Sequence, residues 1–193
     1  MVVEKTWSNE LTSTTVDRSV TLNDLIIKCL DNDRLAQSEL YRMYHGKLLA
    51  LCLRYFSNRD DAVSALNLGF LKIFRNLSKF KKSEDFGAWS YRIVQNTAID
   101  QFRSQTRYDN NVVVDEKPED TGLNPDVVSK LYAEDLIVLL QKLPPTTRMV
   151  FNLFAIEAWT HAEIAERLEI SEGTSKWHVN NARKMLKQWI EKQ

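Results

Sequence analysis

Hydrophobic residues recur with helical spacing through most of the chain from residue 21 onward. Apolar positions three and four residues apart predict three amphipathic helices, separated by the turn-prone segments DNDR and SNRDD. Their stripes are Leu22, Leu25, Ile26, Cys29 and Leu30; Leu40, Tyr44, Leu48, Leu51 and Tyr55; and Ala62, Leu66, Phe70, Ile73, Phe74 and Leu77. A fourth helix, expected from about Phe86, carries Trp89, Ile93, Asn96, Thr97 and Asp100. These helices predict a first domain over residues 21–104.

The helical pattern stops after this domain and resumes only near residue 125. Residues 105–124 are rich in acids and amides and include Pro118, which predicts a flexible acidic linker. A new helix is expected to begin at Pro125, because proline is favoured in a first turn, and Pro144-Pro145 should end it and start the next. The second domain therefore covers 125–193. Residues 1–20 lack an apolar signal core and are expected to form a disordered tail.

The segment from Thr160 to Leu186 has the pattern of a helix-turn-helix, a motif that places its second helix in the major groove of DNA. Thr160 with Glu163 predicts a capping box at the start of the first helix. Ser171 is expected to cap the second helix. The inner stripes of the two helices are Ile164, Ala165 and Leu168, and then Val179, Ala182 and Leu186.

Between its inner positions, the second helix carries side chains that suit base edges and phosphates: Ser175, Lys176, Trp177, Asn180, Asn181, Arg183 and Lys184. Glu172 is the acid that opposes them near the helix start. An ordinary helical hairpin with a solvated basic face is the alternative. The short turn, the two capping signals and the concentration of cations on one helix favour contact with DNA.

Composition supports an all-α fold. Of 193 residues, 44% are hydrophobic, and five glycines with four prolines are too few for a turn-rich β fold. The net charge is zero, but cations outnumber acids over 70–107 and over 171–193, whereas acids dominate over 108–130. Two basic segments separated by an acidic one indicate a nucleic-acid-binding protein. This uneven distribution of charge is a stronger signal than the net charge of zero.

Other classes of function find little support. Cys29 and Cys52 lie in apolar surroundings without metal-type spacing to a histidine, so buried, reduced thiols in a cytoplasmic protein are expected. No apolar run is long enough to predict a transmembrane helix. A P-loop, a Rossmann glycine pattern, HExxH and a nucleophile elbow are all missing from the sequence, so neither an enzyme nor a cofactor or metal is implied.

Two segments resemble the extracytoplasmic-function (ECF) sigma factors of bacterial RNA polymerase. They are FGAWSYRIVQNTAIDQFR at 86–103 and LPPTTRMVFNLFAIEAWTHAEIAERLEISEGTSKWHVNNARKML near the C-terminus, and the resemblance covers about 21–192. It implies that the first domain binds core RNA polymerase and melts the minus-ten promoter element, while the second reads the minus-thirty-five element as duplex. Members of the family are often held by an anti-sigma factor.

The resemblance assigns sites to both domains. Capture of a single strand needs aromatic rings for stacking and cations for the backbone, and the implied set is Lys79, Phe80, Lys81, Lys82, Phe86, Trp89, Arg92, Asn96, Asp100 and Arg103. Thr174 and His178 join the duplex-reading face named above. Core packing is the alternative for Phe86, Trp89 and Trp177, and a solvated loop is the alternative for the lysines.

The implied polymerase-binding residues are Asp60, Asp61, Asn67, Leu68, Phe70 and Phe74. Ser64, Asn67 and Leu68 stand where the family usually has an acid and a Gln-Glu pair, so this interface is expected to be weaker or more apolar than usual, since a charge-assisted contact contributes ~1.5–3 kcal/mol. A sigma-like DNA-binding regulator that has lost polymerase binding is therefore one alternative, and a helical protein-interaction module is another. Glu169 also replaces a common glycine in the helix-turn-helix, at a cost of ~1 kcal/mol if left-handed.

Overall fold

The computed structural model describes residues 21–81, 83–109 and 133–191. These residues form helices joined by turns, with no strand among them, which confirms the all-α prediction. The predicted tail, most of the predicted linker and the helix start predicted at Pro125 lie outside the described residues.

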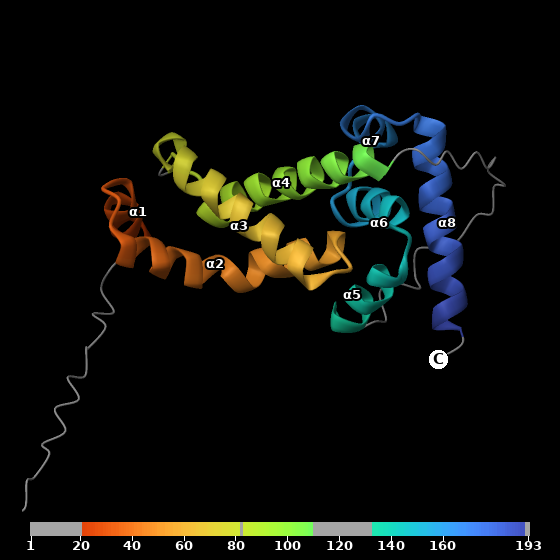
Figure 1. Cartoon of the computed structure of the whole chain (residues 1–193), viewed down its shortest axis with the longest axis horizontal. Helices are drawn as coiled ribbons and strands as arrows, with labels where there is room; N and C mark the ends of the chain where they lie inside the picture. The colour runs from red at the N-terminus through yellow and green to blue at the C-terminus, as the bar shows by residue number, and fades with distance from the viewer. Residues whose placement is uncertain (1–20, 82, 110–132, 192–193) are drawn as a thin grey trace, which may run out of the picture.

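Four helices form the first domain (Figure 1): α1 (Leu22–Leu30), α2 (Arg34–Tyr55), α3 (Arg59–Asn76) and α4 (Phe86–Asp109), with a short 3-10 turn η1 (Leu77–Lys79) after α3. Helix α4 continues past the domain boundary expected at residue 104. The second domain contains α5 (Ala133–Lys142), α6 (Pro145–Phe151), a π-helical turn η3 (Asn152–Ile156), α7 (His161–Leu168) and α8 (Glu172–Ile190). Pro145 opens α6, as predicted.

Side-chain caps fix where the first three helices begin. Thr21 and Asp24 form a capping box at α1, in which the Thr21 side chain accepts the Asp24 N–H. Asp33 accepts the N–H groups of the first turn of α2, and Asn58 accepts the Asp60 N–H at the start of α3. The turn-prone segments in the sequence therefore stop one helix and cap the next.

The core of the first domain lies where α2, α3 and α4 pack against one another. Leu40, Leu66, Ile73, Val94 and Ile99 are fully buried there. Helices α3 and α4 approach closely at Gly69, where an added Cβ would lie 2.8 Å from the Val94 Cγ2 atom. The absence of a side chain at this glycine permits the close packing of the two helices.

The second domain has a smaller core of its own but is also packed onto the first. Leu139, Leu140, Leu143, Phe151, Ala182 and Leu186 join α5, α6 and α8. Met149, Val150 and Leu153, on the other face of α6 and η3, belong to the same buried cluster as the core of α2–α4. The two domains are therefore in direct apolar contact at one end of α2 and α4 (Figure 1).

Hydrogen bonds to backbone carbonyls reinforce this contact at the end of α2. The Gln141 Nε2 atom donates to the Leu53 carbonyl at 3.2 Å, and the Asn152 Nδ2 atom donates to the Arg54 carbonyl at 2.8 Å.

None of the helices in the described residues combines the length and the apolar character needed to cross a bilayer.

The close approach at Gly69 predicts opposite effects of two Gly→Ala substitutions. Gly69→Ala should destabilise the fold by about 1–3 kcal/mol, because Val94 must move to accept the new methyl group. Gly46→Ala on the exposed face of α2, where an added Cβ meets nothing within 4 Å, should stabilise it by about 0.5–1 kcal/mol. Urea unfolding of both variants measures the difference. Equal effects of the two substitutions would contradict the packing described.

Candidate nucleic-acid interface

Helices α7 and α8 form the predicted helix-turn-helix. The Thr160 side chain accepts the Glu163 N–H and the Glu163 carboxylate accepts the Thr160 N–H, so the capping box is confirmed. Ser171 caps α8 by accepting the Thr174 N–H at 2.9 Å. Glu169 ends α7 in the left-handed conformation with φ 59°, the case for which a cost of ~1 kcal/mol relative to glycine was given above. Ile164, Leu168, Val179, Ala182 and Leu186 are buried, which confirms the inner stripes at these positions.

An exposed polar stripe runs along the outer side of α8. Lys176 and Lys184 are exposed, and Asn180 between them is half-buried. These residues lie four positions apart, so they share one face of the helix. Lys176 lies 3.9 Å from Glu172 at the helix start, a separation at which an exposed pair contributes little. The stripe thus presents two cations and an amide to solvent.

Ser175 faces inward, contrary to its predicted place on the DNA-reading face. It is fully buried and shares a hydrogen bond of 2.9 Å with the His161 Nδ1 atom. Position 175 lies one turn before Val179, on the side of α8 that packs against α7. The hydroxyl therefore fastens the two helices of the motif together.

His178 is also turned towards the protein. Its Nδ1 atom lies 2.9 Å from the Thr147 hydroxyl of α6, and its ring packs edge-on against Trp177. Burial lowers the pKa of His178 to about 4, so the ring is neutral at physiological pH. Thr174, Trp177 and Asn181 remain half-buried beside the exposed stripe.

Arg183 is held by a stack of rings that sequence reasoning did not single out. Its guanidinium carbon lies 5.7 Å from the centroid of the Phe154 ring, within cation–π range. Phe154 in turn stacks on His161 at 4.4 Å, with the rings 14° from parallel. Arg183 is thus directed along the junction of η3, α7 and α8.

The aromatic residues at the start of α4 form a single cluster. Phe86 is buried and meets Tyr44, Phe80 and Trp89 at centroid distances of 4.9, 5.3 and 5.6 Å. Phe86 is therefore a core residue and offers no free face to a base, as the core-packing alternative expected. Phe80 and Trp89 cover it and are half-buried, so each retains some exposed ring surface.

Charged and polar residues surround this cluster and continue along α4. Lys79 and Lys81 are exposed beside the aromatic rings, and Arg92 and Asn96 are exposed on the following turns of the helix. Lys82 lies outside the described residues. Apart from Phe86, the predicted set from Lys79 to Asn96 that the structure describes is thus accessible at least in part.

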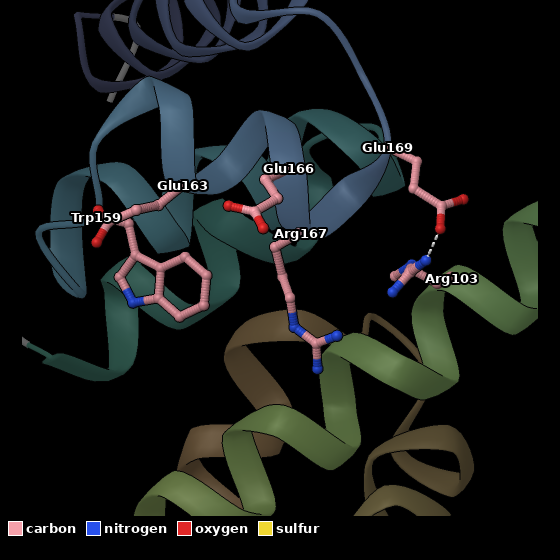
Figure 2. Close-up of a pocket in the computed structure, with 6 residues that line it drawn as sticks. All are labelled: Arg103, Trp159, Glu163, Glu166, Arg167 and Glu169. Carbon is pink, nitrogen blue, oxygen red and sulfur yellow. Dashed lines mark hydrogen bonds and ion pairs between the residues drawn. The ribbon is translucent and has the colours of Figure 1, made fainter.

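Asp100 and Arg103, the last two residues of that set, contact the helix-turn-helix. An Asp100 oxygen lies 2.7 Å from the Arg167 guanidinium of α7, and the other lies 3.3 Å from Lys72. Arg103 pairs with Glu169, and Figure 2 shows it reaching from α4 towards the end of α7. The residues around them line a surface pocket between the two helices: Arg103, Trp159, Glu163, Glu166, Arg167 and Glu169.

The predicted polymerase-binding residues divide into exposed and buried positions on α3. Asn67 and Leu68 are exposed, as is Asp60, while Asp61 and Phe74 are half-buried. The Leu68 side chain is 44% exposed, and Asn67 accepts a hydrogen bond from the Tyr41 hydroxyl at 3.2 Å. Phe70 is buried at 3% exposure against Tyr41, so it belongs to the core rather than to the surface.

Two segments of the chain match protein-family models. The Sigma-70 region 2 model matches residues 40–108, and the Sigma-70 region 4 model matches residues 133–186. The first match spans α2 to α4 and the second spans α5 to most of α8. Together they define a sigma factor, the class of protein that directs RNA polymerase to promoters.

Similar proteins narrow the class. The ECF RNA polymerase sigma factor SigW of Bacillus subtilis is 27% identical over 82% of this chain and 90% of its own length. The ECF RNA polymerase sigma-E factor of Haemophilus influenzae is 25% identical over 86% of this chain and 94% of its own length. Among solved structures, the sigma factor RpoE of Bartonella quintana, in complex with the anti-sigma factor NepR, is 20% identical over 80% of this chain and 96% of that one, with a TM-score of 0.46. The chain belongs to the ECF sigma factor family.

Burial of His178 predicts a pH-dependent contribution to stability. Its folded pKa of about 4 lies below the ordinary value of 6.5, so the contribution is complete above pH 6.5 and is lost as pH falls towards 4, because the unfolded chain binds the proton more readily. Between pH 6.5 and pH 4, the free energy of unfolding of the wild-type protein should fall by about 2–3 kcal/mol more than that of the His178→Gln variant. Urea unfolding across this range measures it. If the stability of the two proteins changed with pH in the same way, burial would not be lowering the pKa of His178.

Proposed function

We propose that this sigma factor divides promoter recognition between its two domains, with no catalytic chemistry of its own. Helix α8 reads the minus-thirty-five element as duplex DNA. The cluster at the start of α4 holds the melted minus-ten strand, and the exposed face of α3 binds core RNA polymerase. The protein acts beside the polymerase in the cytoplasm, and an anti-sigma factor remains an expected partner.

The outward stripe of Lys176, Asn180 and Lys184 is the observation that carries the duplex-reading role. It lies on the second helix of a helix-turn-helix, the element that enters the major groove in this motif. Lysines suit phosphate oxygens, and asparagine suits an adenine edge. Arg183, supported on Phe154, is oriented for a phosphate at the edge of the groove. Ser175 and His178 shape the motif from inside.

The strand-holding role rests on exposed chemistry at the start of α4. Phe80 and Trp89 present ring surface next to Lys79 and Lys81, the pairing of stacking groups and cations that single strands require. The buried Phe86 supports both rings from below, which makes the platform rigid. Rigidity reduces the entropy lost when a base binds.

The polymerase-binding role rests on the α3 surface around Leu68. Asp60 supplies a charge at one end, and Asn67 and Leu68 supply a short amide and an apolar side chain in the middle. A largely uncharged centre gains affinity from buried apolar area rather than from ion pairs. This surface therefore supports binding to the polymerase without the carboxylates that the family usually places here.

Removal of the two lysines of the α8 stripe should weaken duplex binding in a salt-dependent way. For the Lys176→Ala/Lys184→Ala variant, the slope of log affinity against log salt should flatten by up to about 2, one unit for each phosphate that a lysine no longer neutralises. Fluorescence anisotropy with promoter duplex over a salt series measures the slope. Lys28→Ala/Lys47→Ala, which removes two exposed lysines from the first domain, is the control of equal charge and should leave the slope unchanged. Equal slopes in both double variants would remove α8 from the interface.

Run-off transcription with purified core polymerase tests the proposed function as a whole. Promoter-specific transcript is expected, whereas DNA binding without transcript would favour a regulator that has lost polymerase binding. Leu68→Ala should weaken core binding about fivefold, through loss of about 1 kcal/mol of apolar burial. Leu35→Ala, at a leucine that is 83% exposed on α2, is the matched control and should match the unchanged chain. Equal binding by the two variants would exclude Leu68 from the polymerase contact.

A further inference from the structure

Trp177 on α8 is an aromatic side chain that the protein does not use in either hydrophobic core. The structure describes four tryptophans: Trp89, Trp159, Trp177 and Trp189. Trp89 and Trp159 pack against the core around α2, α3 and α4, and Trp189 packs against the core of the second domain. Trp177 is half-buried but packs against neither of them. Because tryptophans outside a core are enriched where partners bind, the exposed part of this ring is available to a partner.

The position of Trp177 on α8 directs its side chain away from the rest of the domain. It lies two residues after Ser175 and two before Val179, and both of these are buried. Two residues correspond to about 200° of rotation around an α-helix, so Trp177 starts on the side opposite to the inner stripe. Lys184, two turns further along, lies on the same side and is exposed. Trp177 therefore borders the exposed polar stripe of α8.

His178 holds the indole ring of Trp177 from one side. The two rings meet edge to face, with their centroids 4.8 Å apart and their planes 75° from parallel. The His178 Nδ1 atom shares a hydrogen bond of 2.9 Å with the Thr147 hydroxyl, which anchors the imidazole to α6. A ring that is held in place before binding loses little conformational entropy when a partner covers it. The indole is thus a preorganised apolar surface on the helix proposed to enter the major groove.

The major groove offers one kind of apolar group to such a ring. Base edges there carry hydrogen-bond donors and acceptors, and thymine alone adds a methyl group, at C5. The indole N–H can donate a hydrogen bond but the ring cannot accept one, so its polar capacity is small. An indole on this face therefore gains most where a thymine methyl group lies against it, because that contact removes apolar surface from water.

We propose that Trp177 is a specificity-determining residue that recognises a thymine of the duplex through contact between its indole ring and the C5 methyl group. His178, anchored on Thr147, is the positioning residue that holds the ring in this orientation. The neighbouring lysines supply affinity for phosphates that does not depend on the base sequence. Trp177 makes the affinity depend on one base. This inference rests on the proposed reading of duplex DNA by α8.

Removal of one methyl group from the DNA tests this contact without any change to the protein. Enrichment of duplexes from a random-sequence pool by the full-length protein provides a binding site, and uracil then replaces each thymine of that site in turn. Fluorescence anisotropy at constant salt gives the ratio of the affinities for the thymine and the uracil duplex. Loss of one buried methyl group should weaken binding about fourfold at one position.

Three protein variants assign the contact to its residues. Trp177→Ala should bind the thymine duplex as weakly as the unchanged chain binds the uracil duplex, with no difference left between the two duplexes. Lys176→Ala, which removes the neighbouring exposed cation, is the matched control; it should weaken binding to both duplexes by the same factor and keep the ratio at about four. Thr147→Val removes the hydroxyl that anchors His178 and should lower the ratio. Urea unfolding shows that each variant is folded.

The possible outcomes separate this proposal from the proposed function. If no thymine is sensitive to the loss of its methyl group, or if Trp177→Ala keeps the full ratio, the recognition of thymine by Trp177 is wrong while duplex reading by α8 stands. A full ratio in Thr147→Val would overturn the positioning role of His178. A pool without an enriched sequence, or equal binding of the selected duplex by Lys176→Ala/Lys184→Ala and the unchanged chain, would contradict duplex reading by α8 itself, and this inference with it.

Discussion

The packing of α6 and η3 against the end of α2 and α4 is the constraint on which the arrangement of the molecule depends. Met149, Val150 and Leu153 merge the two helical cores, so neither domain presents a separate apolar surface there. Apolar contact alone is not directional. The shielded Arg54–Glu157 pair and the bond from Asn152 to the Arg54 carbonyl supply direction, because they require one relative orientation of the domains.

This relative orientation of the domains places opposite charges of the two domains next to each other. Acids of one domain neutralise cations of the other where the domains meet: Asp100 with Arg167, and Glu169 with Arg103. The lysines of α8 and of the loop before α4 point elsewhere and keep their charge exposed. The proposed DNA-binding surfaces therefore remain basic although the net charge of the chain is zero, and such local fields attract DNA.

Local signals were predictable from sequence because their causes lie within a few residues. The capping box of Thr160 and Glu163 and the Ser171 cap both follow from neighbours in the chain. Whether an individual side chain points into the core or towards solvent was less predictable. Ser175 was predicted on the outer face of α8, Phe70 was assigned to the polymerase contact, and Phe86 was left between base stacking and core packing; all three are buried. Helical periodicity defines a stripe, but a position beside the stripe is buried or exposed according to which helix packs next to it.

The amino-acid sequence by itself therefore determined the helices, their caps, the helix-turn-helix and the family. These depend on short-range hydrogen bonding and on the spacing of apolar residues, both of which can be read along one dimension. Only the tertiary structure decided that Glu157 meets Arg54 from 103 positions away, that Phe154 supports Arg183, and that the end of α4 is occupied by α7. No local preference encodes such pairs, because their energies arise when distant segments lose water together in one shared interface.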